Sequence, residues 1–290
     1  CVMAPANLVP EGEGSADADL LSIRNRLVQE IDRHRDLRIA VSGGIDSMLL
    51  AFVAHRFGSD VVTMVHAVSP AVPPQATARV RSYAAREGWA LEIVAAGEFE
   101  DDNYLSNPVN RCYFCKSNLY NRIDALGRGV TASGANLDDL GDYRPGLKAA
   151  SERAVVHPYV DAGIDKATVR ALARMFGLDD LADLPAQPCL ASRVETGIPI
   201  RADDLLFIDR VENEVRRLTG RNATLRCRVT AAGVVIEFED ALLPLRETLS
   251  EAVAALCAEA GRAFAGVRPY RRGSAFIGRT ENAIAEATHG

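Results

Sequence analysis

The chain has 290 residues and carries 33 Lys and Arg against 39 Asp and Glu, a formal net charge of −6. This acidic balance argues against a general polyanion binder, so we do not expect nucleic acid as a partner. With 48% apolar residues, the chain is able to bury a core in one large domain or two ordinary ones. It shows no secretory leader pattern and no apolar run of about 18 residues, so we expect no membrane segment and a cytoplasmic location.

Strand and helix patterns alternate along most of the first 200 residues. Residues 1–17 are rich in Pro, Gly, Ala and Glu, and we expect a loose arm there, ahead of a domain covering 18–200. Apolar runs predict strands at 37–41, 60–68, 90–95 and 130–133, and helical spacing predicts helices at 19–34, 73–88, 111–126 and 166–177. This order predicts an α/β fold with a parallel sheet, helices on both faces and ligands at the carboxyl ends of the strands.

The pattern changes after a proline-rich segment at 178–199. Beyond it we expect a helix, two alternating strands joined by a Thr-Ala-Ala-Gly turn, a second helix and a last strand, at 202–218, 223–229, 233–239, 242–261 and 264–268. This order predicts a smaller α+β domain over 201–290. We expect that domain to serve substrate binding or oligomer contacts.

The loop at 42–47 reads SGGIDS and lies between the first strand and a helix. Its two glycines let the backbone turn tightly, and the following helix N-terminus adds N–H donors and a positive dipole end, which together suit a phosphate or pyrophosphate. Its two serines add hydroxyl donors, and we expect Asp46 to act through Mg²⁺. The loop is neither a Walker A motif nor a dinucleotide fingerprint. An ordinary Gly-Gly turn is the alternative.

Cys112 and Cys115 form a C-x-x-C pair within a predicted helix. Their spacing places both sulfurs on one helix face, yet zinc needs four ligands and an iron–sulfur cluster usually three or four cysteines. A metal site, a redox pair and two buried thiols all remain open. The flanking Arg111 and Lys116 are expected to lower the pKa of both thiols.

Cys189 lies in the proline-rich segment, four residues before Arg193. A loop cysteine next to an arginine is a plausible thiolate, and an ordinary loop cysteine is the alternative. Cys227 and Cys257 occupy positions typical of a core, and we expect both to be buried structural thiols. Glu212 and Glu214 are expected on a helix surface, and metal binding is the alternative.

Five strings occur in the same order as in LarE-type ATP-dependent sulfur transferases of the PP-loop superfamily. They are SGGIDS at 42–47, RCYFCK at 111–116, SGANLDDLGDYRPG at 133–146, QPCLASR at 187–193 with TGIPI at 196–200, and YRRGS at 270–274. The chain therefore resembles this family from residue 37 to about 275. In the domain after residue 201 the resemblance rests on little besides the last string. The resemblance implies a PP-loop domain of the adenine nucleotide alpha hydrolase type.

The resemblance also implies an activity in the synthesis of the nickel-pincer nucleotide. ATP with Mg²⁺ would adenylate a carboxylate of pyridinium-3,5-biscarboxylic acid mononucleotide and release pyrophosphate. Sulfur would then displace AMP and leave a thiocarboxylate. Family members divide on the sulfur source, which is either a sacrificed cysteine matching Cys189 or an exogenous sulfide carried by a [4Fe-4S] cluster on Cys112, Cys115 and Cys189. Because all three cysteines are present, we favour the cluster.

The family pattern assigns roles to further residues. Cys189 and Asp46 would be catalytic. The nucleotide contacts would be Ala40, Ser42, Gly43, Gly44, Asp46, Ser47, Gly134, Asn136 and Asp138, and the contacts to the substrate phosphate would be Arg193, Arg226, Arg228 and Arg271. The family forms hexamers, so we expect a homo-oligomer.

Each of these roles has an alternative. The residues after the fourth strand are also common turn residues, and the arginines at 226 and 228 would equally suit a solvated strand face. The alternative functions are a PP-loop tRNA thiolase and a non-enzymatic nucleotide sensor with a structural metal at the C-x-x-C pair.

Overall fold

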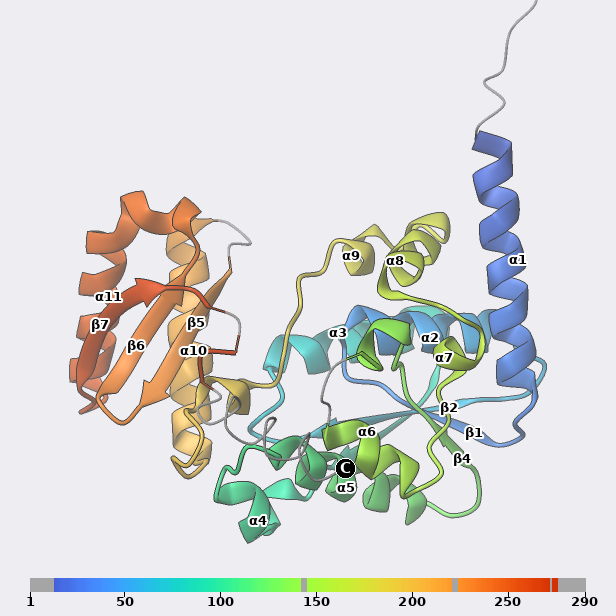
Figure 1. The fold of residues 1–290 in the computed structure, drawn as a ribbon, viewed down its shortest axis with the longest axis horizontal. Coiled ribbons are helices and arrows are strands. Elements are labelled where there is room, and N and C mark those ends of the chain that lie inside the picture. Colours follow the sequence, from blue (N-terminus) through green and yellow to red (C-terminus); the bar gives the residue numbers. More distant parts are fainter. Residues whose placement is uncertain (1–12, 142–144, 221–223, 272, 276–290) are drawn as a thin grey trace, which may run out of the picture.

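The computed structural model describes residues 13–141, 145–220, 224–271 and 273–275, and two β-sheets organise them (Figure 1). The larger sheet has the order β3-β2-β1-β4, with β1 at Leu37–Ala40, β2 at Thr63–Val68, β3 at Ala90–Ala95 and β4 at Val130–Ala132. All of its strand pairs are parallel. The predicted α/β class with a parallel sheet is therefore confirmed.

The order of the strands places a reversal at β1. The chain leaves β1 for β2 and β3 on one side, and then crosses to β4 on the other side. In parallel sheets the carboxyl ends of two strands that diverge in this way leave a crevice between their loops. The segments that follow β1 and β4 are the 42–47 loop and the start of the 133–146 string.

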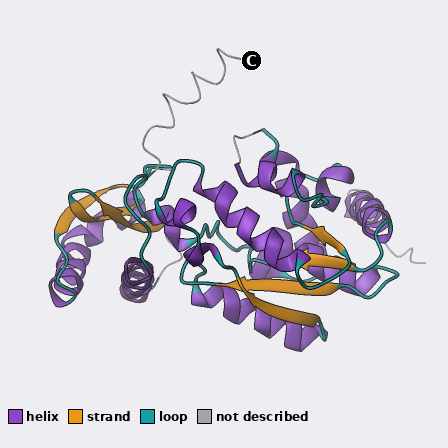
Figure 2. Ribbon diagram, turned by 90° about the horizontal axis from the view of Figure 1, so that it is seen from below, coloured by secondary structure: helices purple, strands orange, loops and turns teal. Residues whose placement is uncertain are grey.

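Helices cover both faces of this sheet, as Figure 2 shows. On one face α2 (Ile45–Phe57) lies in the main core with residues of α1 (Glu13–Asp32), α3 (Pro74–Glu87) and α8 (Lys166–Met175). On the other face α5 (Arg111–Asp124) packs with α6 (Pro145–Ser151) in a smaller apolar cluster. Three further one-turn helices are α4 (Asp102–Leu105), α7 (Pro158–Asp161) and α9 (Asp179–Ala182).

The first helix begins at Glu13, so the last five residues of the expected loose arm are helical, while residues 1–12 lie outside the described residues. Within the described parts of the chain, no helix combines the length and the apolar character that crossing a membrane requires.

The second sheet has the order β5-β6-β7, with β5 at Leu225–Thr230, β6 at Gly233–Phe238 and β7 at Phe264–Pro269. The first two strands form the predicted antiparallel hairpin, and β7 pairs parallel to β6. Two helices, α10 (Ala202–Thr219) and α11 (Arg246–Glu259), pack on this sheet. The last helix starts four residues later than expected because residues 240–245 form a 3₁₀ turn that contains Pro244. Cys227 and Cys257 are buried, as predicted.

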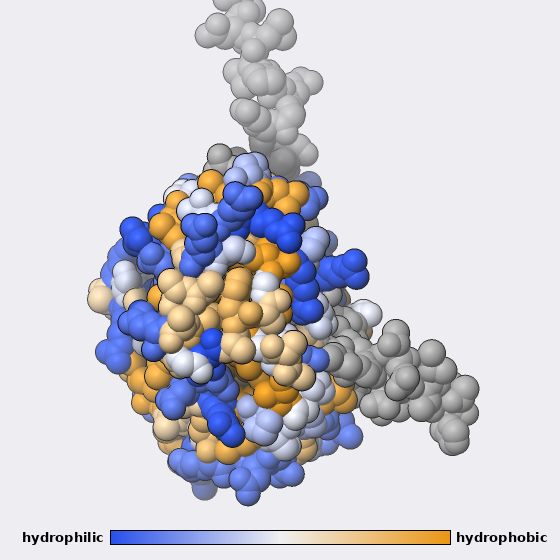
Figure 3. Space-filling model, turned by 90° about the vertical axis from the view of Figure 1, so that its left-hand side faces the viewer, coloured by the Kyte–Doolittle hydropathy of each residue, from blue (hydrophilic) through white to orange (hydrophobic). Residues whose placement is uncertain are grey.

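The outer face of this second unit is apolar in patches. Figure 3 shows orange areas between charged side chains on the side of the molecule formed by the second sheet and its helices. Single exposed apolar side chains are normal on protein surfaces, and this face carries no assignment on that ground alone.

The segment around Cys189 belongs structurally to the second unit. Leu190, Ala191 and Val194 lie in the same core cluster as β5, β6 and α10, and Val194 forms an isolated bridge with Val229 of β5. The backbone N–H of Leu190 also donates to the carbonyl of Ala71 in the loop after β2, at 2.8 Å. The cysteine segment is thus fixed between the two sheets.

The close approach of α3 to the 42–47 loop makes Gly43 a sensitive position. Gly43 has φ +81°, and a Cβ there would lie 2.7 Å from the carbonyl oxygen of Ala76. Gly163→Ala is a matched control, because Gly163 has φ +69° with open space around it. The control is expected to lose about 1 kcal/mol of unfolding free energy from backbone strain. Gly43→Ala should lose about 1–3 kcal/mol more from overlap. Urea unfolding measures both, and equal losses would contradict the packing argument.

Candidate functional site

The 42–47 loop is closed by its own hydroxyl groups. The backbone N–H of Ser42 donates to the Ser47 hydroxyl at 3.0 Å, and the two serine hydroxyls lie 3.1 Å apart. The Ser47 hydroxyl also donates to the carbonyl of Gly44 at 3.2 Å. Gly44 precedes α2 and provides no side-chain hydrogen bond to cap it. The N–H groups at the start of α2 therefore have no side-chain cap, which suits a bound anion.

Asp46 stands at the centre of this arrangement. One of its carboxylate oxygens accepts from the side-chain amide of Asn136 at 3.1 Å, and the other lies 2.5 Å from the ammonium of Lys166. The buried hydroxyl of Tyr159 donates to the backbone carbonyl of Asp46 at 3.0 Å. The side chain of Asp46 is 29% exposed, so solvent and ligands reach it.

The loop after β4 meets the first loop at this point. A Cβ on Gly134 would lie 2.7 Å from the backbone N of Ser47, so only glycine allows the two loops to approach this closely. Asp138 accepts from the backbone N–H of Lys166 at 3.2 Å. The structure therefore gathers Gly134, Asn136 and Asp138 around the first loop, as the expected nucleotide site requires, and their contact with nucleotide stays a prediction.

Lys166 was not foreseen from the sequence. It follows the N-cap Asp165 at the first position of α8, where the positive end of the helix dipole disfavours a cation. A lysine in this unfavourable position is the signal in the sequence that points to a functional residue. Its partner Asp46 is 120 residues away, and only the folded sheet shows the pairing.

Arg79 connects the first loop with the cysteine segment. One guanidinium nitrogen lies 2.6 Å from the carbonyl oxygen of Gly43 and 3.3 Å from the side-chain oxygen of Gln187, two residues before Cys189. Burial lowers the pKa of Arg79, and the nearby Asp180 carboxylate acts in the opposite direction. Nothing in the sequence singles out Arg79, because α3 shows only an ordinary helical pattern there.

The three candidate cysteines come from two segments. Cys112 and Cys115 lie in the first turns of α5, Cys189 precedes a 3₁₀ turn at Leu190–Arg193, and none of them is in a disulfide. Cys115 and Cys189 pack against the same core cluster. Burial, together with the charges of Cys189, Glu98 and Cys112, raises the pKa of the Cys115 thiol, while Lys116 lowers it. The expected lowering of this thiol pKa by its flanking cations is therefore wrong for Cys115, because burial outweighs Lys116.

No group of three or more His, Cys, Asp or Glu side chains within the described residues is arranged to hold a metal ion. A zinc site of ordinary coordination is therefore not formed among these residues. Each thiolate of a [4Fe-4S] cluster binds a different iron, so a cluster does not require three sulfurs to converge on one point. The assignment of a cluster to Cys112, Cys115 and Cys189 stays a prediction.

Arg193 is buried and holds the backbone of the cysteine segment. Two of its nitrogens lie 2.9 Å from the two carboxylate oxygens of Glu212 on α10, and a third donates to the carbonyls of Pro188 and Cys189 at 2.6 and 3.1 Å. Glu212 is 1% exposed and also accepts from Arg216 and from the backbone N–H of Cys227. The expected position of Glu212 on a helix surface is therefore wrong, because its carboxylate neutralises the buried Arg193.

Arg228 is also paired within the protein. Its side chain is 5% exposed, lies 2.7 Å from Glu237 and donates to the carbonyl of Ser192 at 2.9 Å. Glu237 accepts in addition from Arg268 and from the hydroxyl of Ser274. The alternative of a solvated strand face does not hold for Arg228.

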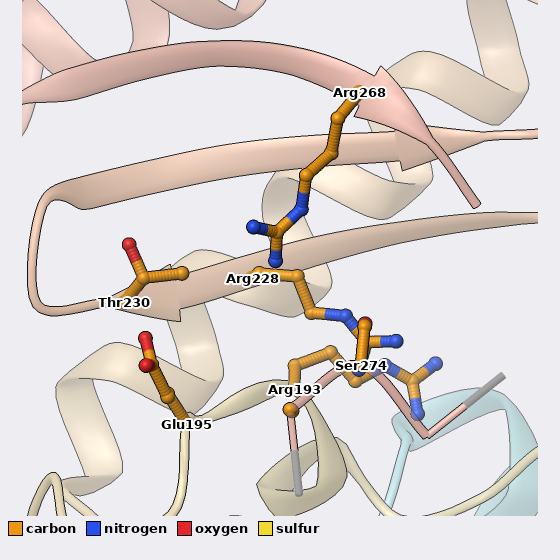
Figure 4. A pocket seen from close by; sticks show the side chains of 7 residues that line it. Arg193, Glu195, Arg228, Thr230, Arg268 and Ser274 are labelled. Atoms are coloured by element: carbon orange, nitrogen blue, oxygen red, sulfur yellow. The ribbon is translucent and has the colours of Figure 1, made fainter. Parts of the chain in front are cut away.

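A cavity of about 70 Å³ lies beside these arginines (Figure 4). It is lined by Arg193, Glu195, Arg228, Thr230, Arg268, Ser274 and Ala275. Figure 4 shows Arg193, Arg228 and Ser274 close together. Arg226 is partly buried with its guanidinium 5.6 Å from the ring centre of Tyr270, and Arg271 is exposed. To bind phosphate, Arg193 and Arg228 would have to divide their guanidinium donors between the phosphate and the carboxylates of Glu212 and Glu237. A role of Arg226 or Arg271 in phosphate binding requires no such division.

Three curated proteins are similar to this chain. It is 39% identical over 209 residues to the uncharacterized protein slr1717 of Synechocystis. The matched residues make up 71% of this chain and 76% of slr1717. It is 26% identical over 227 residues to the uncharacterized protein MJ0830 of Methanocaldococcus jannaschii, covering 77% and 85%. It is 29% identical over 206 residues to the pyridinium-3,5-bisthiocarboxylic acid mononucleotide synthase of Lactiplantibacillus plantarum, covering 69% and 74%. No model of a known protein family matches.

The burial of the Arg193–Glu212 pair leads to a prediction about stability. Arg193→Met leaves a buried carboxylate that keeps only Arg216 and one backbone N–H as partners, and it frees two backbone carbonyls. The expected loss is about 3–5 kcal/mol of unfolding free energy in a denaturant titration. Arg217→Met is the control, since it removes an exposed ion pair on the same helix and is expected to change nothing measurable. A small loss for Arg193→Met would show that this arginine is not a structural anchor.

Proposed function

We propose that this chain, which belongs to one family with slr1717 of Synechocystis and is similar to the Lactiplantibacillus plantarum synthase, is a LarE-like, ATP-dependent sulfur transferase of the PP-loop type. The proposed substrate is pyridinium-3,5-biscarboxylic acid mononucleotide, whose carboxylate becomes a thiocarboxylate. The observation that carries the proposal is the Arg79 bridge, because it joins a loop suited to phosphate with the segment that bears Cys189.

In the first step the substrate carboxylate attacks the α-phosphorus of ATP. The bond to pyrophosphate breaks, and pyrophosphate leaves with the electron pair. The N–H groups at the N-terminus of α2, which no side chain caps, and the ammonium of Lys166 would oppose the charge that builds on the leaving group. Asp46 and Asp138 would hold Mg²⁺ through carboxylate oxygens, and the metal would supply positive charge against the phosphates.

In the second step a sulfur nucleophile attacks the acyl carbon of the adenylate. The carbon–sulfur bond forms, the bond to AMP breaks, and AMP leaves with the electron pair. Cys189 lies in a segment that is fixed by Arg193 and by the bond from Leu190 to Ala71, so its sulfur occupies a defined position.

The donor set Cys112, Cys115 and Cys189 suits a [4Fe-4S] cluster in its chemistry, since all three ligands are soft thiols and two of them lie against one apolar core. Such a cluster, when bound by three thiolates, supplies an open iron for inorganic sulfide. The other source of sulfur is the side chain of Cys189 itself.

Iron and sulfide analysis of anaerobically purified protein, with its intact mass before and after turnover, separates the two sources. We expect about four irons per chain, a broad visible absorbance and an unchanged mass after reaction with ATP and substrate. Colourless protein that loses the mass of H₂S at Cys189 would instead identify this cysteine as the sulfur donor.

Cys189→Ser is expected to abolish the thiocarboxylate product while pyrophosphate release continues, because only the second step needs this sulfur. Product is measured by mass spectrometry and pyrophosphate by a coupled assay. Cys112→Ser is the companion variant, which should remove iron yet spare a single turnover if Cys189 is sacrificed. Product formation by Cys189→Ser would exclude the assignment.

Asp46→Asn is expected to lose pyrophosphate release, since an amide binds Mg²⁺ far more weakly than a carboxylate and no longer pairs with Lys166. Asp60→Asn serves as the control, because Asp60 is exposed just beyond the other end of α2. An Asp46→Asn rate equal to that of the control would refute the role of Asp46.

A further inference from the structure

Lys166 contacts both of the carboxylates that would hold Mg²⁺. Its ammonium lies 2.5 Å from one oxygen of Asp46, and its backbone N–H donates to the carboxylate of Asp138 at 3.2 Å. Asn136 joins the same two residues, since its side-chain amide donates to Asp46 and its side-chain oxygen accepts from the backbone N–H of Asp138, each at 3.1 Å. The fold therefore brings two acidic side chains and one ammonium to a single place.

The ammonium of Lys166 occupies a place where it competes with a metal ion. It lies against the oxygen of Asp46 that does not accept from Asn136, so a metal ion on the same carboxylate would stand next to a like charge. The side chains of Lys166 and Asp46 are 33% and 29% exposed, so ions and nucleotides reach both from solvent. A carboxylate that an ammonium already neutralises attracts a divalent cation less strongly than a free carboxylate does.

The Lys166 ammonium is able to move while the backbones around it stay fixed. The helix that carries Asp46 lies in the main core, and the hydroxyl of Tyr159 donates to the backbone carbonyl of Asp46 at 3.0 Å. The helix that starts at Lys166 is anchored in the same core by Val169 and Leu172. The ammonium itself stands on a flexible four-carbon stem. Because Asp46 lies in the first turn of α2, an anion at this uncapped helix N-terminus would bind beside the ammonium.

We propose that Lys166 keeps Mg²⁺ away from Asp46 and Asp138 until a nucleoside triphosphate binds. The phosphate oxygens carry more negative charge than one carboxylate, so they draw the ammonium from Asp46, and the two carboxylates then accept Mg²⁺ together with the nucleotide. No covalent bond changes in this exchange. Nucleotide and metal bind cooperatively as a result, because the nucleotide removes the charge that opposes the metal. The inference rests on the proposed function, which supplies the nucleotide and the metal.

Binding of Mn²⁺, which takes the same oxygen ligands as Mg²⁺, tests the inference without turnover. Free Mn²⁺ is measured by electron paramagnetic resonance in titrations of the full-length protein, alone and with α,β-methylene ATP, which cannot release pyrophosphate. The unmodified protein should bind Mn²⁺ about tenfold more weakly without the nucleotide than with it. Lys166→Met should bind Mn²⁺ alone about tenfold more tightly than the unmodified protein, because the opposing charge is gone. Lys166→Arg keeps that charge and should bind Mn²⁺ as weakly as the unmodified protein.

Lys148→Met is the matched control, since it makes the same change of charge at an exposed lysine of α6 that contacts the ring of Tyr113. It should leave Mn²⁺ binding unchanged, and adding Asp46→Asn to Lys166→Met should abolish the gain. Equal Mn²⁺ affinities of Lys166→Met and the unmodified protein, or a gain that survives Asp46→Asn, would overturn the inference and leave the proposed function intact. So would an unmodified protein that binds Mn²⁺ as tightly alone as with nucleotide. Failure of the unmodified protein to bind α,β-methylene ATP with Mn²⁺ would overturn the proposed function, and the inference with it.

Discussion

The buried ion pair of Arg193 and Glu212 fixes the position of the segment that carries Cys189. Removing both charges from water is costly, and such a pair persists only where further hydrogen bonds satisfy the remaining atoms. Here the arginine takes two backbone carbonyls of the cysteine segment, and the carboxylate takes a backbone N–H of β5 and a second arginine. The pair therefore joins an irregular, proline-rich segment to a helix and a strand. These contacts add to the bond from Leu190 to Ala71, which holds the same segment beside the first sheet.

The first sheet imposes a complementary constraint, which is the close approach of backbones. The loops after β1 and β4 touch at Gly134, and α3 touches the first loop at Gly43, with no room for a side chain at either contact. This crowding brings Asp46, Asn136 and Lys166 within hydrogen-bond distance although they lie in three separate parts of the sequence. The arrangement places carboxylate, amide and ammonium at the carboxyl ends of two diverging strands. Such an edge is where a parallel sheet offers N–H groups to a ligand.

Much of this fold follows from local pattern. The strand at 90–95 is found at the predicted residues, and the helix predicted at 73–88 covers Pro74–Glu87 and ends at a left-handed Gly88. Errors arise where distant residues decide. Glu212 reads as a surface residue because its neighbours on the helix are charged, and only the fold shows Arg193 opposite it. The partnership of Lys166 with Asp46 is likewise invisible in a sequence, as is the burial that outweighs Lys116 at Cys115.

Arg79 links the first loop to the segment that carries Cys189. Its guanidinium contacts a carbonyl of the phosphate loop and the side chain of Gln187, so it lies between the place where an anion would bind and the segment that carries Cys189. A guanidinium binds phosphate oxygens more strongly than a neutral carbonyl or amide, because those contacts are charge-assisted. Anion binding at the loop would therefore compete with the contact to Gln187.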